Sequence, residues 1–271
     1  VRNSTFTSAS SELLAVLLGA SASSDLLVEG NTFANGHPAI SSAGGGVLVA
    51  TAGAGAAPTL TYRVAGNSFR GALGTALTVQ KGAGAGSFSG TIEGNVVGVS
   101  GVANSGSAQG SGLDVTLTGG GSHVVAVKNN QVRQYNNFGI LLQAGGNLSG
   151  GNGSLSATVT GNTVQQVGTL GFPASGVSLN GGTNSGDAHS ICLDMSGNAL
   201  AGSSFGTGTE FRLRQRFLTT VRLPGYAGGN ADNAAVVAFE QANNGNPVGF
   251  ASNTVATGGG GFVGGAGCTQ P

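Results

Sequence analysis

The chain has 271 residues, of which 53 are glycine and only 7% are charged. Its ten basic residues balance its ten acidic residues, which gives neither the basic footprint of a nucleic-acid-binding protein nor an acidic tail. Regular segments of valine, leucine, isoleucine and phenylalanine, with a mean hydropathy of +0.16, argue against disorder, and no apolar run is long enough to predict a transmembrane helix.

The first apolar segment spans residues 13–18. It resembles the apolar part of a signal peptide, but only Arg2 precedes it as a basic residue, and Asn3 already fits the repeat described below. We therefore interpret this segment, which includes Leu13 and Leu17, as a buried strand. The chain is expected to begin inside a stack of layers, and the open first layer either follows a removed segment or is used for contact.

A short corner recurs along the chain. Residues 157–164 are typical of a strand of β-branched threonines, a Gly161-Asn162 corner that tolerates positive φ, and a second short strand. Equivalent asparagines stand at Asn3, Asn31, Asn67, Asn95, Asn130, Asn162, Asn198 and Asn253. Their spacings are 28, 36, 28, 35, 32, 36 and 55 residues, and the last contains an insertion. A period of this size predicts a solenoid, a propeller or an array.

Each unit also holds a second apolar strand, for example at residues 75–79, 112–117, 139–142 and 176–179. Helical repeats need longer segments rich in alanine, leucine, glutamate and lysine, so a helical array is excluded. Strands stacked in successive layers would pair in parallel, with apolar side chains inside and the corner asparagines aligned in a ladder. The predicted ladder consists of Asn31, Asn67, Asn95, Asn130, Asn162, Asn198 and Asn253.

The repeated Gly-Asn-(Thr/Ser)-(Phe/Val) corner resembles that of the right-handed parallel β-helices of bacterial surface and secreted proteins. These include adhesin-like repeat proteins, phage tailspikes and polysaccharide lyases. The resemblance covers roughly residues 1–200 and implies an all-β fold, a right-handed parallel β-helix of about seven layers. It implies no single function, because enzymes and non-enzymes share this scaffold.

Residues 201–271 depart from the repeat. Residues 210–223 alternate polar and apolar side chains, which is typical of a half-exposed strand. Residues 231–243 are either a short helix, with an Asp-Asn pair near its start, or another strand. We expect a β-helix over residues 1–200, followed by a C-terminal insert and tail that pack on its last layers.

Cys192 and Cys268 are the two cysteines of the chain. A disulfide between them would close a loop of about 76 residues, attach the tail to the last regular layer and stabilise the fold by about 4 kcal/mol. Such a bond favours an oxidising, extracellular setting. The alternative is a pair of buried free thiols.

Candidate catalytic residues are few. Asp187, His189 and Asp194 form the densest group of titratable residues, yet no nucleophile or metal-ligand pattern accompanies them. Glu29 and Glu93 both precede a corner, two layers apart, as expected of a solvated ladder. We therefore predict neither a catalytic site nor a bound cofactor or metal.

Arg212, Arg214 and Arg216 alternate along one predicted strand. Three guanidinium groups on one face can bind sulfate, phosphate or an acidic partner. Three acidic residues close in sequence offer partners within the chain: Glu210, Asp232 and Glu240. Salt bridges within or between subunits are the first interpretation, ahead of a solvated strand edge and of ligand binding. The candidate contacts between subunits are Arg212, Arg214, Arg216, Arg222, Leu13 and Leu17.

The low surface charge and the open first layer favour self-association, because little repels a second copy at the end of the stack. A head-to-tail contact at such an end does not close and yields a fibre. The sequence therefore predicts a non-enzymatic, extracellular or cell-surface structural subunit that assembles end to end, with the C-terminal insert in the joint. The alternatives are a segment of a bacterial adhesin that binds cell-surface glycans, and a polysaccharide lyase or hydrolase, which the lack of tryptophan disfavours.

Overall fold

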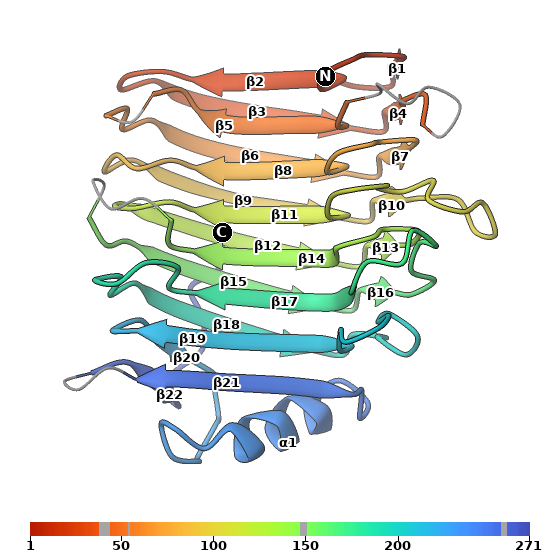
Figure 1. Ribbon diagram of the computed structural model, residues 1–271. Coiled ribbons are helices and arrows are strands. Elements are labelled where there is room, and N and C mark those ends of the chain that lie inside the picture. The colour runs from red at the N-terminus through yellow and green to blue at the C-terminus, as the bar shows by residue number, and fades with distance from the viewer. Residues whose placement is uncertain (38–43, 54, 147–150, 256–258) are drawn as a thin grey trace.

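The computed structural model describes residues 1–37, 44–53, 55–146, 151–255 and 259–271, and its fold is a parallel β-helix (Figure 1). Through residue 164, the chain runs in each coil along a front sheet, turns into a rear sheet, and crosses a short corner sheet before the next coil begins. Neighbouring strands pair in parallel in all three sheets. In Figure 1 the front strands run to the left and the rear strands to the right as the chain descends, which makes the winding right-handed.

The front and rear sheets each contain eight of the described strands, and the corner sheet contains six. The front sheet consists of β2 (Leu14–Leu18), β5 (Val47–Thr51), β8 (Leu77–Lys81), β11 (Leu113–Leu117), β14 (Phe138–Ala144), β17 (Ser175–Gly181), β19 (Phe211–Phe217) and β21 (Gly249–Val255). The rear sheet consists of β3 (Ser23–Glu29), β6 (Thr59–Ala65), β9 (Ser87–Glu93), β12 (Ser122–Lys128), β15 (Ser154–Thr160), β18 (Ser190–Ser196), β20 (Thr220–Arg222) and β22 (Gly261–Val263). The corner sheet consists of β1 (Thr5–Thr7), β4 (Thr32–Ala34), β7 (Ser68–Arg70), β10 (Val96–Val97), β13 (Gln131–Val132) and β16 (Thr163–Val164).

Alternation along the strands fills the interior of the β-helix. In β9, Phe88 and Ile92 are fully buried and point into the core. Ser89 and Thr91, the alternate residues, are only partly buried and point to the outer face. In the corner sheet, the rings of Phe6, Phe33 and Phe69 stack with centroids 5.0 and 5.1 Å apart. Equivalent side chains of successive coils therefore lie on one another and form one core along the axis.

Backbone geometry explains the Gly-Asn repeat. The residue before each corner asparagine has a positive φ, as seen at Gly30 (65°), Gly66 (61°), Gly94 (60°), Asn129 (56°), Gly161 (64°) and Gly197 (63°). Glycine adopts this conformation without a steric penalty, and asparagine tolerates it better than most residues. The pair therefore turns the chain from the rear sheet into the corner sheet.

The region after residue 200 differs from the expected insert. Strands β19 and β21 continue the front sheet, and β20 and β22 continue the rear sheet. Strands β19, β20, β21 and β22 thus add coils to the β-helix, whereas the tail after residue 263 packs on the outside of earlier coils. The Gly197-Asn198 corner precedes β19, and the alternating residues of β19 pair with β17.

The helix α1 (Asn233–Asn243) interrupts these last coils. Asp232 caps its start, because the Asp232 side chain accepts a hydrogen bond of 2.9 Å from the N–H of Ala235. The helix packs on β21 and β18 and lies across the lower end of the stack (Figure 1). Val236 and Glu240 are its buried side chains.

Strand β2 occupies the segment that was expected to be buried, but it is only half buried. Leu18 is 5% exposed, whereas Leu17 is 61% exposed. Successive side chains of a strand point to opposite faces, so Leu17 lies outside while Leu18 faces the core. The prediction of burial is therefore wrong for Leu17.

Candidate functional site

Six of the seven predicted ladder asparagines line up along the corner. Each donates from Nδ2 to Oδ1 of the next, at 3.0, 3.0, 3.0, 2.9 and 2.9 Å along the series Asn31, Asn67, Asn95, Asn130, Asn162 and Asn198. All six side chains are buried. Because buried amides are costly unless they are bonded, this ladder holds successive corners in register.

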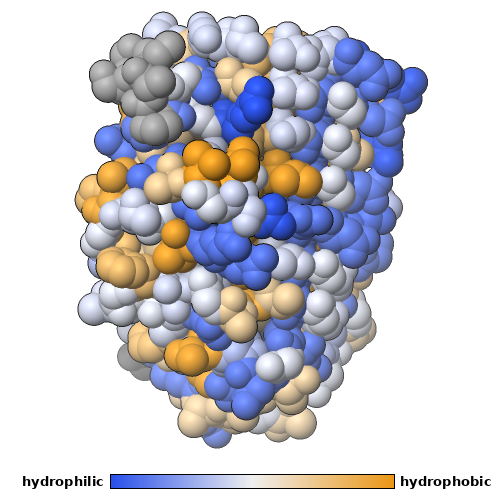
Figure 2. Space-filling model, turned by 90° about the vertical axis from the view of Figure 1, so that its right-hand side faces the viewer, coloured by the Kyte–Doolittle hydropathy of each residue, from blue (hydrophilic) through white to orange (hydrophobic). Residues whose placement is uncertain are grey.

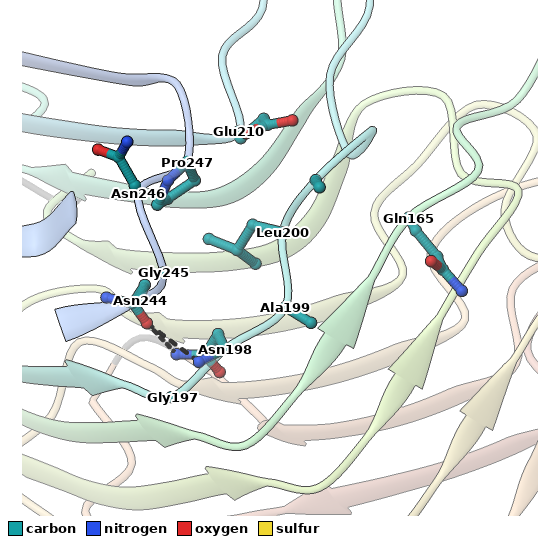
Figure 3. Close-up of a pocket in the computed structure, with 11 residues that line it drawn as sticks. Gln165, Gly197, Asn198, Ala199, Leu200, Glu210, Asn244, Gly245, Asn246 and Pro247 are labelled. Atoms are coloured by element: carbon teal, nitrogen blue, oxygen red, sulfur yellow. Dashed lines mark hydrogen bonds between the residues drawn. The ribbon is translucent and has the colours of Figure 1, made fainter. Parts of the chain in front are cut away.

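The seventh rung is Asn244 and not Asn253. Asn198 donates from its backbone N and its Nδ2 to Oδ1 of Asn244, at 3.2 and 2.8 Å (Figure 3). Asn253 instead lies on β21 opposite Gln215, and its Nδ2 donates to the carbonyl of Asn230 at 2.6 Å. Asn244 is the C-cap of α1, so the corner motif of the sequence gives no signal for it.

Cys192 and Cys268 form the disulfide predicted from the sequence. The bond holds the C-terminal tail on the outer face of the rear sheet. Beside it, Oγ of Ser156 donates to the carbonyl of Thr269 at 2.8 Å. Disulfides of this kind persist in oxidising surroundings.

Glu29 and Glu93 lie in a ladder of alternating charge on the outside of the rear sheet. Arg63 bridges them, with N–O distances of 2.5 Å to Glu29 and 2.8 Å to Glu93. Arg2 pairs with Glu29, and Lys128 with Glu93, each at 3.1 Å. Hydrogen bonds lower the pKa of Glu29, chiefly through Arg63, and the pKa of Glu93, chiefly through Lys128. The two carboxylates are therefore cross-linked within the chain.

Of the predicted group of Asp187, His189 and Asp194, only Asp187 and His189 lie in contact. Nε2 of His189 lies 3.7 Å from Oδ1 of Asp187, whereas Asp194 lies five residues beyond His189, about 16 Å away at the rise of a strand. Oδ2 of Asp187 accepts the N–H of Thr183 at 2.6 Å, and Nδ1 of His189 accepts the N–H of Gly153 at 3.1 Å. Burial lowers the pKa of His189 in spite of Asp187. Both side chains hold loops in place.

Two buried polar contacts escape prediction from the sequence. The Tyr62 hydroxyl lies 2.9 Å from Nε2 of His123 in the core, and burial lowers the pKa of His123 to about 4. Nζ of Lys81 donates to the carbonyls of Gly82 at 2.9 Å and Gly120 at 2.6 Å, and burial lowers the pKa of Lys81 to about 8. No local motif marks these residues, because His123 lies 61 residues from Tyr62 and Gly120 lies 39 from Lys81.

A cavity of about 490 Å³ lies beside the last rung of the asparagine ladder (Figure 3). Its lining includes Gln165, Leu200, Glu210 and Pro247. After Asn244 the chain turns away at Gly245, which has a φ of 76°, so a further corner strand is not formed there. The Glu210 carboxylate accepts the N–H of Gly202 at 2.7 Å and of Val248 at 2.8 Å, and so joins the two loops around the cavity.

The arginine row, which we define as Arg212, Arg214 and Arg216, lies on the outer face of β19. Arg212 stacks over the ring of Phe138, 4.7 Å from its centroid, and its Nε donates to Oγ of Ser178 at 3.2 Å. Burial, followed by the proximity of Arg214 and Arg216, lowers the pKa of Arg212 to about 10. The row is therefore a partly desolvated group of like charges.

The other predicted contact residues do not join this row. Arg222 lies on the rear sheet, where its Nε is 3.4 Å from Sγ of Cys192. Leu17 belongs to β2 and Leu13 precedes it, at the other end of the stack (Figure 1). The six residues therefore do not form one surface.

The acidic residues expected to neutralise the arginine row are engaged elsewhere. Glu210 holds two loop amides, and Asp232 caps α1. Glu240 is buried beneath α1, where burial raises its pKa to about 8. Among the described residues, which include all ten carboxylate side chains, no ion pair involves the arginine row.

The loops between the corner and front sheets expose large apolar side chains. These are Val99, Val102, Leu170, Phe172 and Phe205. Figure 2 views this side and shows the apolar patches separated by polar surface.

Comparison with protein-family models, with curated proteins and with solved structures finds no match for this sequence. No helix in the described part of the chain is long and apolar enough to cross a membrane. Function therefore has to be inferred from the geometry of the chain itself.

Proposed function

We propose that this chain is a non-enzymatic structural module of an extracellular or cell-surface protein, of the adhesin-segment type, rather than the repeating subunit of a filament. The position of α1 favours an adhesin-type segment over a filament subunit, because the helix covers the end of the stack where a further coil would pair (Figure 1). An end-to-end filament needs an open strand edge at both ends of each subunit.

The contacts of α1 are those of a cap. A helix satisfies its backbone groups internally and so presents no strand edge. Val236 is fully buried beneath it, and Asn244 closes the asparagine ladder by donating from Nδ2 to the carbonyl of Met195 at 2.9 Å. Solenoids depend on such caps to remain soluble, because an uncovered end invites further pairing.

The engagement of polar side chains supports a structural role. Asp187, His189 and Lys81 all bond to backbone groups of loops, and Glu29 and Glu93 are cross-linked by cations. The disulfide between Cys192 and Cys268 supports an oxidising, extracellular setting. These side chains therefore stabilise a rigid scaffold.

Replacing Val236 by Asp tests the proposal, because a carboxylate beneath α1 loosens the cap without altering the strands. We expect the unmodified chain to remain monomeric at high concentration in light scattering, and the Val236→Asp variant to associate end to end, as seen by negative-stain electron microscopy. Ala238→Asp is the matched control, since Ala238 lies on the exposed face of the same helix.

Fibres formed by the unmodified chain would overturn the proposal in favour of a filament subunit. A Val236→Asp variant that keeps its β circular dichroism, loses the helical contribution and stays monomeric would also contradict it, because the helix would then not be what ends the stack. An equal response of the Ala238→Asp control would assign the association to added charge and not to the loss of the cap.

A further inference from the structure

We propose that the outer face of the front sheet around β19 is a binding site for a linear acidic polysaccharide, held by the arginine row. The site depends on the front sheet alone, so it goes beyond the structural role and does not depend on how the stack ends.

The spacing of the arginine row suits a ligand with repeated anionic groups. Alternate residues of a strand point to the same face, so neighbouring arginines of the row are about 6.6 Å apart. Guanidinium groups bind carboxylates and sulfates through paired N–H donors in a fixed geometry. An extended chain that carries one anion every few ångströms can therefore contact all three.

The neighbouring strands add no opposing charge. In register, Arg212 lies between Ser178 and Phe250, and Arg214 lies between Asn180 and Ser252. Asp187 acts on Arg216 electrostatically, but no ion pair joins them in the described part of the chain. The mutual repulsion within the row is therefore relieved most directly by an anion from outside.

Two features adapt the face to a sugar chain rather than to small ions alone. Phe138 holds the Arg212 guanidinium from one side, and Phe250, which is 43% exposed, offers an apolar surface next to it. Among the described residues, the buried atoms Oδ1 of Asn180 and Nε of Arg216 have no hydrogen-bond partner, so the polar groups of this face are not all satisfied internally. Apolar surface with a few polar groups at fixed positions is the composition of a ligand site.

Polygalacturonate is the probe for the test, with neutral dextran of similar length for comparison, both measured by biolayer interferometry at low ionic strength. The double substitution Arg214→Gln/Arg216→Gln is expected to weaken polygalacturonate binding by about tenfold or more, since it removes two charged contacts. Arg70→Gln/Arg133→Gln removes the same charge from the corner side and is expected to change the affinity less than about twofold.

Several outcomes would overturn the site. These are no binding of polygalacturonate by the unmodified chain, equal losses in the two double variants, or equal affinity for dextran. Tighter binding of dextran sulfate, with the same loss in Arg214→Gln/Arg216→Gln, would support the site and assign sulfate as its anion. Equal affinity for duplex DNA through the same arginines would overturn the polysaccharide assignment. The role of α1 as a cap is tested by the oligomeric state, so none of these binding results bears on it.

Discussion

Asn130 shows how a single side chain joins three coils of the β-helix. Its Oδ1 accepts two hydrogen bonds from Asn95, and its Nδ2 donates to the carbonyl of Ile92 and to Oδ1 of Asn162. All these groups are buried, so each depends on the others for a partner. A break at one residue therefore affects the coils on both sides.

We expect Asn130→Ala to lower the free energy of unfolding by about 3 kcal/mol, because it removes the buried acceptor of two Asn95 donors and the buried amide that bonds Ile92 and Asn162. Urea denaturation followed by circular dichroism measures this loss. Asn129→Gly is the matched control, since Asn129 is exposed with a φ of 56° and glycine suits that conformation. Equal stability of the two variants would contradict the role of the ladder.

The ladder also shows what a local motif can and cannot predict. Positions such as Asn67 and Asn162 are evident from the sequence, because the positive φ of the preceding glycine and the buried amide act within one corner. Asn244 takes its place in the ladder at the end of α1, which follows the short rear strand β20. This placement depends on tertiary packing, which no local spacing records.

At the scale of the element, α1 carries an unusual buried group. Glu240 is 1% exposed, its Oε1 has no hydrogen-bond partner among the described residues, and its Oε2 is 3.4 Å from Nδ2 of Asn244. Burial, assisted by Asp194 of β18, raises its pKa to about 8. The helix therefore docks most favourably with a neutral Glu240.

This shift predicts a pH dependence of stability. The unfolded chain loses the Glu240 proton near pH 4.5, whereas the folded chain keeps it up to about pH 8, so folding loses stability as the pH rises through this window. Glu240→Gln stays neutral, and its advantage over the unmodified chain should grow from near zero at pH 4.5 to about 5 kcal/mol above pH 8.

His123 and Asp114 also have shifted pKa values, but they contribute equally to the unmodified chain and to Glu240→Gln. The difference in stability between these two proteins therefore reports Glu240. Denaturation curves at intervals between pH 4.5 and pH 9 provide the measurement. A constant difference across this range would show that Glu240 does not stay protonated beneath α1.

At the scale of the whole molecule, the C-terminal tail is bound back onto an earlier coil. The disulfide joins residues 76 positions apart, and Nε2 of Gln270 donates to Oγ1 of Thr158 at 2.6 Å. The last coils are thus tied to the middle of the rear sheet. The cross-link acts mainly by restricting the unfolded chain, since the loop that it closes is long.

We expect Cys192→Ser/Cys268→Ser to lower the free energy of unfolding by about 4 kcal/mol and to release the tail. Urea denaturation and limited proteolysis of residues 264–271 measure the two effects. The unmodified chain in reductant should behave like the double variant. Unchanged stability and an uncleaved tail in both would contradict the expectation.

The sequence predicted the repeating coils of the β-helix better than the way in which the last coils are built. Period, alternation and the Gly-Asn corner are local signals that repeat, and they led to a parallel β-helix with a disulfide-tethered tail. They assigned β19 to β22 to a separate insert, because the regular spacing of the corner asparagines stops after Asn198, although these strands pair in the same sheets. The arginine row was identified, but the absence of ion pairs to it in the described part of the chain depends on where Glu210, Asp232 and Glu240 lie in space.

The connections from the corner sheet to the front sheet differ greatly in length at constant register. Residues 98–112 join β10 to β11, whereas only residues 133–137 join β13 to β14, and Leu113 still pairs with Ile140. Evolution could therefore change these loops by insertion or deletion without shifting the pairing of the strands or the packing of the interior. For protein engineering, the same side is a natural display platform, where a foreign peptide can be grafted between two coils without shifting the strands that carry it.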